Sequence, residues 1–175
     1  MAILEIITAP DPRLKVVSKP VKVVDEAIRT LLDDMLETMY DADGIGLAAI
    51  QVGIEQRVIV INFSDEEGKK NEPLELINPE LVWSSEEERS HEEGCLSLPE
   101  HFAEVIRSEE IKLRYLDRDG KKQECAANGI LSTCIQHEMD HLEGILFVDH
   151  ISAVRRNMIL RKLKKLRRQK QTEAA

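Results

Sequence analysis

Apolar residues recur at helical spacing in three segments of the chain. In residues 25–43 they occupy one helix face, at positions 28, 31, 32, 35, 36 and 39. Asp25 stands just before this face and is a suitable N-cap, because its side chain can accept a hydrogen bond from the first turn. Residues 128–144 also predict a helix, since the segment opens with an asparagine and closes with a glycine. A third helix, amphipathic and basic, is predicted for residues 151–171.

Other apolar runs are typical of strands. Residues 56–63 are mostly apolar, as expected for a buried strand. Residues 74–83 predict a second strand that is broken or bent at an internal proline, and the polar residues 64–73 predict a loop between the two. Residues 111–126 alternate in polarity and contain an Asp-Gly pair, which together predict a hairpin.

The composition fits a globular protein. The chain has 175 residues, of which 42% are hydrophobic, so it can form one domain with a sizeable core. There is no repeat, low-complexity segment or linker, and we therefore expect a single α+β domain over residues 1–175, with 151–171 as a basic C-terminal helix. Aromatic residues are only 3%, which argues against stacking on nucleic-acid bases as the main activity.

The termini and the cysteines indicate a compartment. The first residues lack the basic segment and long apolar stretch of a secretion signal, and no segment approaches the about 20 apolar residues of a membrane span. The three cysteines are an odd number, which favours reduced thiols. We therefore expect a cytoplasmic protein that does not contact a membrane.

Charge is distributed unevenly along the chain. The net charge is −9, but the residues after 150 contain nine Lys and Arg and a single acid, Glu173, so this tail carries +8 and residues 1–150 carry −17. One interpretation is a helix that docks on the domain and exposes its basic residues to water. The alternative is that the tail binds RNA. The phosphates would attract the basic tail and repel the acidic body, so the tail would make the contact. The apolar residues available for docking are Ile151, Val154, Met158, Leu160, Leu163 and Leu166.

The segment QHEMDHLEG, residues 136–144, contains the spacing H-E-x-x-H. His137 and His141 are about 6 Å apart along a helix and share a face, so both rings can bind one metal ion. A pair of histidines packed in a core is the ordinary alternative. Glu138 follows the first histidine, and we favour a metal site in which this carboxylate is not a ligand.

A catalytic metal site needs a third protein ligand. The histidine expected six residues after His141 is replaced by Phe147, and the only acid of the last helix, Glu173, lies near its end. The remaining donors are the cysteines. Cys134 points away from the histidine pair because Cα–Cβ bonds tilt toward the helix N-terminus, and a strand carries Cys125. Cys95 follows a glycine in an extended segment and is favoured, although the spacing alone leaves all three cysteines open.

Three segments in order resemble the signature motifs of the peptide deformylase family: GIGLAAIQ at 44–51, EGCLS at 93–97 and QHEMDHLEG at 136–144. The resemblance covers nearly the whole chain, and the basic tail is similar to that of the bacterial type with a C-terminal helix. It implies an α+β fold with small antiparallel sheets around a central metal-binding helix and a C-terminal amphipathic helix. It also implies a hydrolase that removes the formyl group from the N-formylmethionine of newly synthesised proteins and releases formate.

The resemblance further implies a ligand set and a cofactor. Cys95, His137 and His141 would bind one Fe²⁺ per chain, with Zn²⁺, Ni²⁺ or Co²⁺ as possible substitutes. Glu138 would be the catalytic residue. The residue types agree with this chemistry, because a metal cation makes water acidic near neutral pH and an adjacent carboxylate can accept the proton.

Five other positions receive roles from the resemblance. The Gln51 side chain and the Leu96 backbone N–H would stabilise the oxyanion. Ile45, Gly46 and Glu93 would contact the substrate. As partners, the resemblance implies formylmethionyl nascent peptides and the ribosome near its exit tunnel, the latter through the basic helix, and we expect a monomer.

Three positions outside the motifs bear on substrate preference. His91 and Thr133 stand where several bacterial relatives have aliphatic residues that line the methionine pocket. Phe102 stands where some relatives have an arginine that contacts the peptide. The preference for residues after methionine therefore stays open.

Three other functions compete with this interpretation. A zinc peptidase shares the H-E-x-x-H spacing but lacks its usual downstream ligand here. Gly44, Gly46 and Ala49, followed by Asp65, match a dinucleotide-binding fingerprint, yet the segment before them predicts a helix and not the required strand. An RNA- or ribosome-binding module without catalysis is the third, and such a module would not need Glu138.

Overall fold

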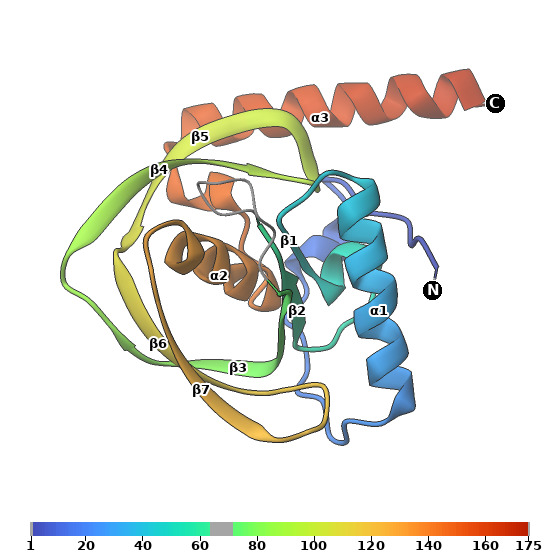
Figure 1. Cartoon of the computed structure of the whole chain (residues 1–175). Coiled ribbons are helices and arrows are strands. Elements are labelled where there is room, and N and C mark those ends of the chain that lie inside the picture. Colours follow the sequence, from blue (N-terminus) through green and yellow to red (C-terminus); the bar gives the residue numbers. More distant parts are fainter. Residues whose placement is uncertain (1, 64–71, 175) are drawn as a thin grey trace.

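The computed structural model describes residues 2–63 and 72–174. A five-stranded antiparallel sheet has the strand order β1-β2-β3-β6-β7 (Figure 1). The structure confirms the predicted strands at 56–63 and 74–83 and the predicted hairpin. Most of the predicted loop 64–73, including Asp65, lies outside the described residues. The five strands are β1 (Gly46–Ala48), β2 (Val58–Ile61), β3 (Leu74–Ser84), β6 (Glu110–Leu116) and β7 (Lys122–Asn128).

The bend predicted in β3 is present. Asn78 has a positive φ of 51°, and the register with β6 shifts between Ile77 and Glu80, around Pro79. The Asn78 side chain stabilises this bend, because its amide accepts from Val21 N at 2.8 Å and donates to Val21 O at 2.9 Å. The bend lets the sheet curve around the helix on its inner face, as Figure 1 shows.

Two helices cover the two faces of this sheet. The helix α1 (Glu26–Asp41) begins at Asp25, whose side chain accepts a hydrogen bond from Ile28 N as predicted. Side chains of α1 pack on one face with Val58 and Val60, while Ile59 packs on the other face toward α2 (Gly129–Leu142). The continuous apolar run of β2 therefore arises because both of its faces are buried.

A long hairpin forms a second sheet of two strands, β4 (Glu88–Cys95) and β5 (Leu98–Ser108). The sequence predicted only a short extended segment around Cys95. The inward side chains of β4 include Arg89, His91 and Glu93, so the alternation of apolar residues that usually reveals a strand is missing. Together the two sheets surround α2, which is the α+β arrangement expected.

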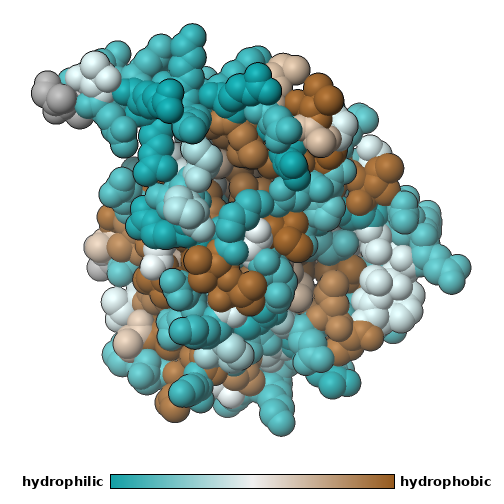
Figure 2. Space-filling model, turned by 180° about the vertical axis from the view of Figure 1, so that it is seen from behind, coloured by the Kyte–Doolittle hydropathy of each residue, from teal (hydrophilic) through white to brown (hydrophobic). Residues whose placement is uncertain are grey.

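The C-terminal helix α3 (Ala153–Ala174) runs past β5 along one side of the molecule (Figure 1). It docks through Ile159 and Leu163, which are buried in a cluster with β5. The expected docking face was wrong in part, because Val154 is 74% and Met158 48% exposed. Figure 2 shows hydrophilic residues along this helix, whose end projects from the body at the upper left.

Short 3-10 helices complete the fold: η1 (Pro12–Lys15), η2 (Ala49–Val52) and η3 (Phe147–His150). No helix in the described part of the chain is long and apolar enough to cross a membrane.

Candidate metal centre

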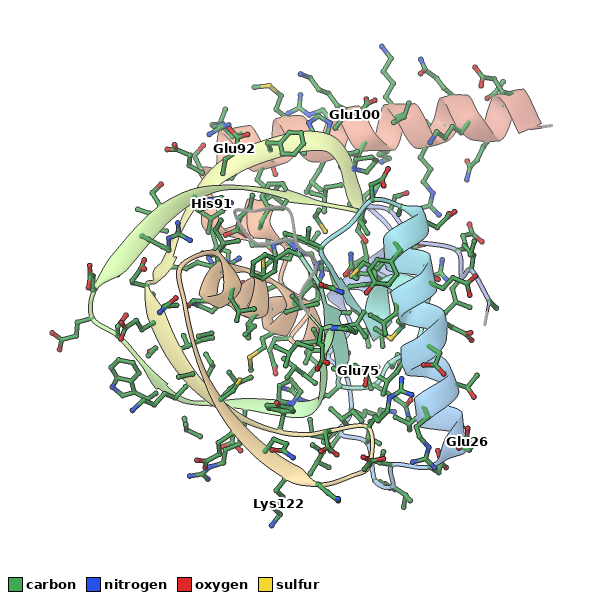
Figure 3. The ribbon with its side chains drawn as sticks, viewed as in Figure 1. Glu26, Glu75, His91, Glu92, Glu100 and Lys122 are labelled. Atoms are coloured by element: carbon green, nitrogen blue, oxygen red, sulfur yellow. The ribbon has the colours of Figure 1, made fainter. Side chains whose placement is uncertain are left out.

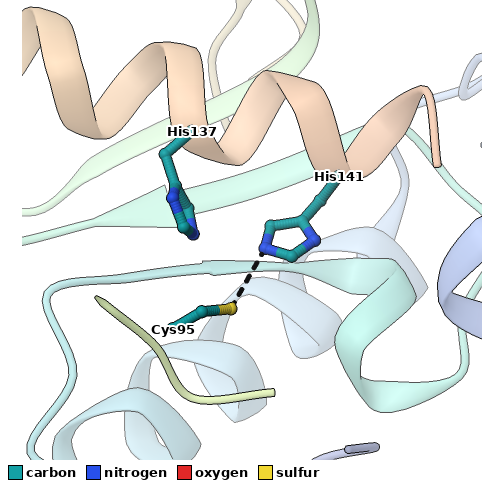
Figure 4. Close-up of side chains that lie close together, drawn as sticks. All are labelled: Cys95, His137 and His141. Atoms are coloured by element: carbon teal, nitrogen blue, oxygen red, sulfur yellow. Dashed lines mark hydrogen bonds between the residues drawn. The ribbon is translucent and has the colours of Figure 1, made fainter. Parts of the chain in front are cut away.

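The two histidines of the H-E-x-x-H segment project from the C-terminal half of α2 toward the turn after β4. His137 and His141 are 8% and 1% exposed, and their ring centroids are 5.0 Å apart. Cys95, the last residue of β4, faces them, with 3.4 Å between its Sγ and His141 Nε2 (Figure 4). One donor atom from each of the three residues lies within 4.8 Å of the others, so a single ion can reach all three.

The other two cysteines are not part of this cluster. Cys134 lines the wall of the adjacent pocket, and burial raises the pKa of its thiol to about 12. Cys125 lies on the edge strand β7, where burial also raises the pKa. A raised pKa disfavours the thiolate form that binds metals, and neither thiol lies within reach of the two histidines in the cluster.

A buried ion pair fixes the orientation of His137. Its Nδ1 lies 2.8 Å from Glu93 Oε1, and Arg107 donates two hydrogen bonds to the same carboxylate, of 2.7 and 3.0 Å. Burial opposes the ionisation of Glu93, but the hydrogen bonds from His137 and Arg107 prevail and lower its pKa to about 2. An ionised carboxylate can only accept, so Nδ1 carries the proton and the lone pair of Nε2 is free for a metal.

Glu93 was expected among the substrate contacts. It lines the pocket, but its hydrogen-bond partners are His137 and Arg107, which points to a supporting position behind the histidine. Arg107 also donates to Asp140 at 2.8 Å, one turn of α2 further along. The sequence did not reveal Arg107, because nothing near it in the chain indicates a buried partner.

Glu138 has the opposite environment. It is 5% exposed, and its Oε2 has no hydrogen-bond partner within the described residues. Burial raises its pKa to about 7, against the opposing effect of His137. Gly46 permits this position, since a Cβ there would lie 2.6 Å from Glu138 Oε1. A buried carboxyl with a free oxygen and a pKa near neutrality can both accept and donate a proton.

Gln51 approaches from the 3-10 helix η2 and is 1% exposed. Its Nε2 donates to Ser97 Oγ at 3.0 Å and lies 3.5 Å from Cys95 Sγ. The glutamine is therefore a neighbour of the Cys95 sulfur and not the surface residue that its position after an apolar run would suggest.

A pocket of about 390 Å³ opens beside the cluster. Its wall includes Gly46, Leu96 and Glu138 as well as the two positions expected in a methionine pocket, His91 and Thr133. Figure 3 shows His91 on the hairpin strand β4, with Glu92 and Glu100 further along the hairpin. The exposed part of the pocket lining consists of Asp43, Ile45, Glu92, Gly94, Glu100 and Phe102.

Residues 3–157 match the family model described as polypeptide deformylase. The chain belongs to the peptide deformylase family. Peptide deformylases from Bartonella quintana and Rhizorhabdus wittichii are 53% identical over 175 residues and 55% identical over 172 residues. These matches cover 100% and 96% of this chain, and 99% and 97% of the two relatives.

Solved peptide deformylase structures have the same fold. The crystal structure of the Ehrlichia chaffeensis peptide deformylase in complex with actinonin matches with a TM-score of 0.90 and 42% identity, covering 94% of this chain and 98% of that one. A Legionella pneumophila peptide deformylase matches with a TM-score of 0.87 and 46% identity, covering 97% and 98%. The expected α+β fold, the family and the enzyme class are therefore confirmed.

The family assignment also decides between the competing interpretations. The chain belongs to the peptide deformylase family, which excludes a zinc peptidase, and it is an enzyme, which excludes a purely RNA-binding module as a description of the whole chain. The dinucleotide fingerprint fails on structure, because helix α1 ends at Asp41 just before Gly44 and no strand precedes the glycines in the described part of the chain.

Proposed function

We propose that this member of the peptide deformylase family removes the formyl group from N-terminal N-formylmethionine of nascent proteins, releasing formate and a free amine. The observation that carries the proposal is the convergence of Cys95, His137 and His141 beside Glu138, whose buried Oε2 lacks a partner within the described residues. A thiolate, two imidazoles and an adjacent unpaired carboxylate suit a transition metal with a water beside it.

In this proposal, Cys95, His137 and His141 hold one divalent cation per chain. When bound, the cation acts as a Lewis acid that makes water a stronger acid near neutral pH. A thiolate donates more charge than an imidazole and suits Fe²⁺, with Zn²⁺, Ni²⁺ or Co²⁺ as substitutes. Glu93 and Arg107 keep His137 in the tautomer that presents Nε2.

The remaining roles belong to the chain itself. Glu138 accepts the proton that leaves the attacking water and donates it to the departing amine, for which a pKa of about 7 is well matched. The Gln51 amide and the Leu96 backbone N–H donate to the oxygen of the formyl group as charge develops there. Ile45 and Gly46 line the pocket beside these groups and contact the methionine and its backbone.

The cellular setting is part of the same proposal. Formylmethionyl chains emerge from ribosomes, so the enzyme acts in the cytoplasm, as a monomer whose basic helix α3 docks near the exit tunnel. Seven of the nine basic residues of the tail are exposed and have no carboxylate partner within the described residues. These seven are Arg155, Arg161, Lys162, Lys164, Lys165, Arg168 and Lys170.

The test is formate release from a short formyl-Met peptide by protein purified without oxygen, with its metal content measured on the same sample. The unformylated peptide is the control, because a peptidase would cleave it. We expect formate from the formylated peptide, no cleavage of the control, and about one iron per chain. Protein that contains one metal per chain yet releases no formate would overturn the proposal.

A further inference from the structure

The amide group of Gln51 has a fixed orientation. Its Oε1 accepts a hydrogen bond of 2.9 Å from Ala48 N, and a backbone N–H can only donate. This contact therefore identifies the oxygen end of the amide and turns Nε2 toward the turn between β4 and β5. There Nε2 donates to Ser97 Oγ at 3.0 Å and lies 3.5 Å from Cys95 Sγ.

Ser97 is suited to hold this amide because it is itself held in place. It is fully buried, and its backbone O accepts from Ala9 N at 2.8 Å. The backbone O of Gln51 accepts from Ile7 N at 2.7 Å, so the same extended N-terminal segment fixes both residues. The Ser97 hydroxyl and the Gln51 amide therefore belong to two segments that are both hydrogen-bonded to the same stretch of the N-terminal chain.

We propose that Ser97 is a positioning residue for the reaction. Its hydroxyl accepts one N–H of Gln51 and thereby directs the second N–H of the same nitrogen toward Cys95 Sγ and the oxygen of the substrate. The inference rests on the proposed function, in which Gln51 stabilises that oxygen. Without the hydroxyl, one N–H of a buried amide loses its acceptor, and the side chain rotates to recover it.

The chain offers a closely matched control. Ser132 in α2 is also fully buried, and its Oγ accepts from the side-chain Nε2 of Gln136 at 2.9 Å while donating to Ser108 O at 3.0 Å. Ser132→Ala removes the same chemical group, with the same burial and the same type of partner, but away from the metal-binding cluster. It separates loss of a buried hydroxyl from loss of the orientation of Gln51.

The first measurement is steady-state kinetics of the metal-loaded enzyme. We expect Ser97→Ala to lower kcat by about 10- to 100-fold with little change in KM, short of the roughly 10²–10³-fold that removal of an oxyanion donor costs. Ser97→Thr, which keeps the hydroxyl, should retain most of kcat, and Ser132→Ala should leave it unchanged. A kcat of Ser97→Ala equal to that of the wild type would overturn the proposal.

A second measurement does not depend on activity. In ¹⁵N-labelled, zinc-loaded protein, the Gln51 side-chain amide, assigned by its absence in Gln51→Glu, should exchange its protons slowly in the wild type, Ser97→Thr and Ser132→Ala, and quickly in Ser97→Ala. Slow exchange in Ser97→Ala would overturn the proposal even if deformylation itself were absent. If Ser97→Ala does not fold, Ser97→Cys, with a weaker acceptor of similar shape, takes its place and the same outcomes apply.

Discussion

Helices α2 and α3 differ in how much of their surface the protein covers. The 14-residue α2 lies between the two sheets and buries eight residues, five of them polar or charged: Ser132, Thr133, His137, Glu138 and His141. The 22-residue α3 lies on the outside and buries only Ile159 and Leu163 within its described residues. A buried polar group needs a partner inside the protein, whereas water can solvate an exposed one.

The difference teaches where each helix can act. On α2 some polar side chains are held by internal partners, as His137 is by Glu93. Others keep an atom with no hydrogen-bond partner in the described residues, as Glu138 does at Oε2. Such groups are positioned for chemistry. On α3 the basic side chains face solvent, so their charge is available to a second macromolecule and contributes little to stability.

The largest effect is expected from Glu138→Gln in α2. It removes the proposed proton acceptor and donor while leaving the three proposed ligands in place, so kcat should fall by about 10²–10⁴-fold with unchanged metal content. Formate release and metal analysis on one sample measure both. The control is Glu143→Gln at the C-terminal end of the same helix, where the side chain is half exposed and pairs with Arg57, and there kcat should stay near that of the wild type. Near-normal turnover in metal-loaded Glu138→Gln would contradict the role of Glu138 in proton transfer, and with it the view that the buried polar groups of α2 carry the chemistry.

The second prediction concerns the thiols. Cys95→Ser should lower metal affinity by more than the roughly 10- to 100-fold cost of losing an outer partner, because it removes a direct ligand. Cys134→Ser and Cys125→Ser should keep a full metal content, since both thiols lie outside the cluster. Metal content after dialysis against a weak chelator is the measurement, and an empty site in Cys134→Ser alone would contradict the assignment.

The third prediction tests how α3 is attached. Leu163→Ala should destabilise the protein by about 2–5 kcal/mol, because Leu163 is 3% exposed in a packed cluster. Val154→Ala, at a 74% exposed position of the same helix, should change stability by no more than about 0.5 kcal/mol. Denaturant unfolding gives both values. Equal effects would mean that α3 does not dock through the Ile159–Leu163 stripe.

Two buried carboxyl groups, Glu138 in α2 and Asp11 beside α3, should respond to pH in opposite directions. In metal-free protein, Glu138 has a pKa of about 7 against an ordinary 4.5, so its contribution to stability is full below about pH 4.5 and is lost as the pH rises through 7. Asp11, paired with Arg13 and with Arg167 of α3, has a pKa lowered to about 2, chiefly by its hydrogen bond with Arg13. Its contribution is present above about pH 3.8 and is lost as the pH falls through 2.

Unfolding curves of two variants measure this contrast. At about 1.4 kcal/mol per pKa unit, Glu138→Gln should gain up to a few kcal/mol over the wild type between pH 4.5 and 7. Asp11→Asn should instead lose the wild-type dependence below about pH 4. A constant difference between Glu138→Gln and the wild type across that range would show that the carboxyl is not perturbed.

The smallest effect on catalysis is expected from the exposed charges of α3. Replacing five of them by Gln should abolish co-sedimentation with ribosomes at low salt while sparing hydrolysis of a short formyl-Met peptide, because binding to phosphate depends on charge. The same exchange at Arg114 and Lys122 on the β6–β7 hairpin is the control and should leave sedimentation intact. Unchanged sedimentation of the fivefold variant would leave α3 as a structural helix only. The five positions are Arg161, Lys162, Lys164, Lys165 and Arg168.

Much of the fold could be predicted where apolar spacing reflects burial on one face. This held for α1, α2, the strands β2 and β3, and the β6–β7 hairpin. It failed for β4, whose inward side chains Arg89, His91 and Glu93 are polar. The apolar positions predicted for docking do not share one face of α3, so the sequence favoured Met158 where the structure buries Ile159. That the chain forms a single domain stays a prediction.

The site was predictable to the extent that chemistry is local in sequence. The i, i+4 spacing predicted the pairing of His137 with His141, and a resemblance in three motifs singled out Cys95 among the cysteines. The partners that orient these groups could not be predicted, because Arg107 and Ser97 reach Glu93 and Gln51 only after the hairpin has folded onto α2. Those contacts depend on tertiary structure and leave no periodic signal.

The hairpin β4–β5 shares no strand with the five-stranded sheet within the described residues, so it forms a distinct part of the pocket wall. Side chains fasten it to α2, through His137 with Glu93 and Arg107 with Asp140. If it opens as a unit, it carries Cys95 away from the histidines. The proposed metal then binds only the closed population, and its apparent dissociation constant equals the intrinsic one divided by the closed fraction. Affinity for the ion is thus a property of the hairpin's equilibrium as well as of the three ligands.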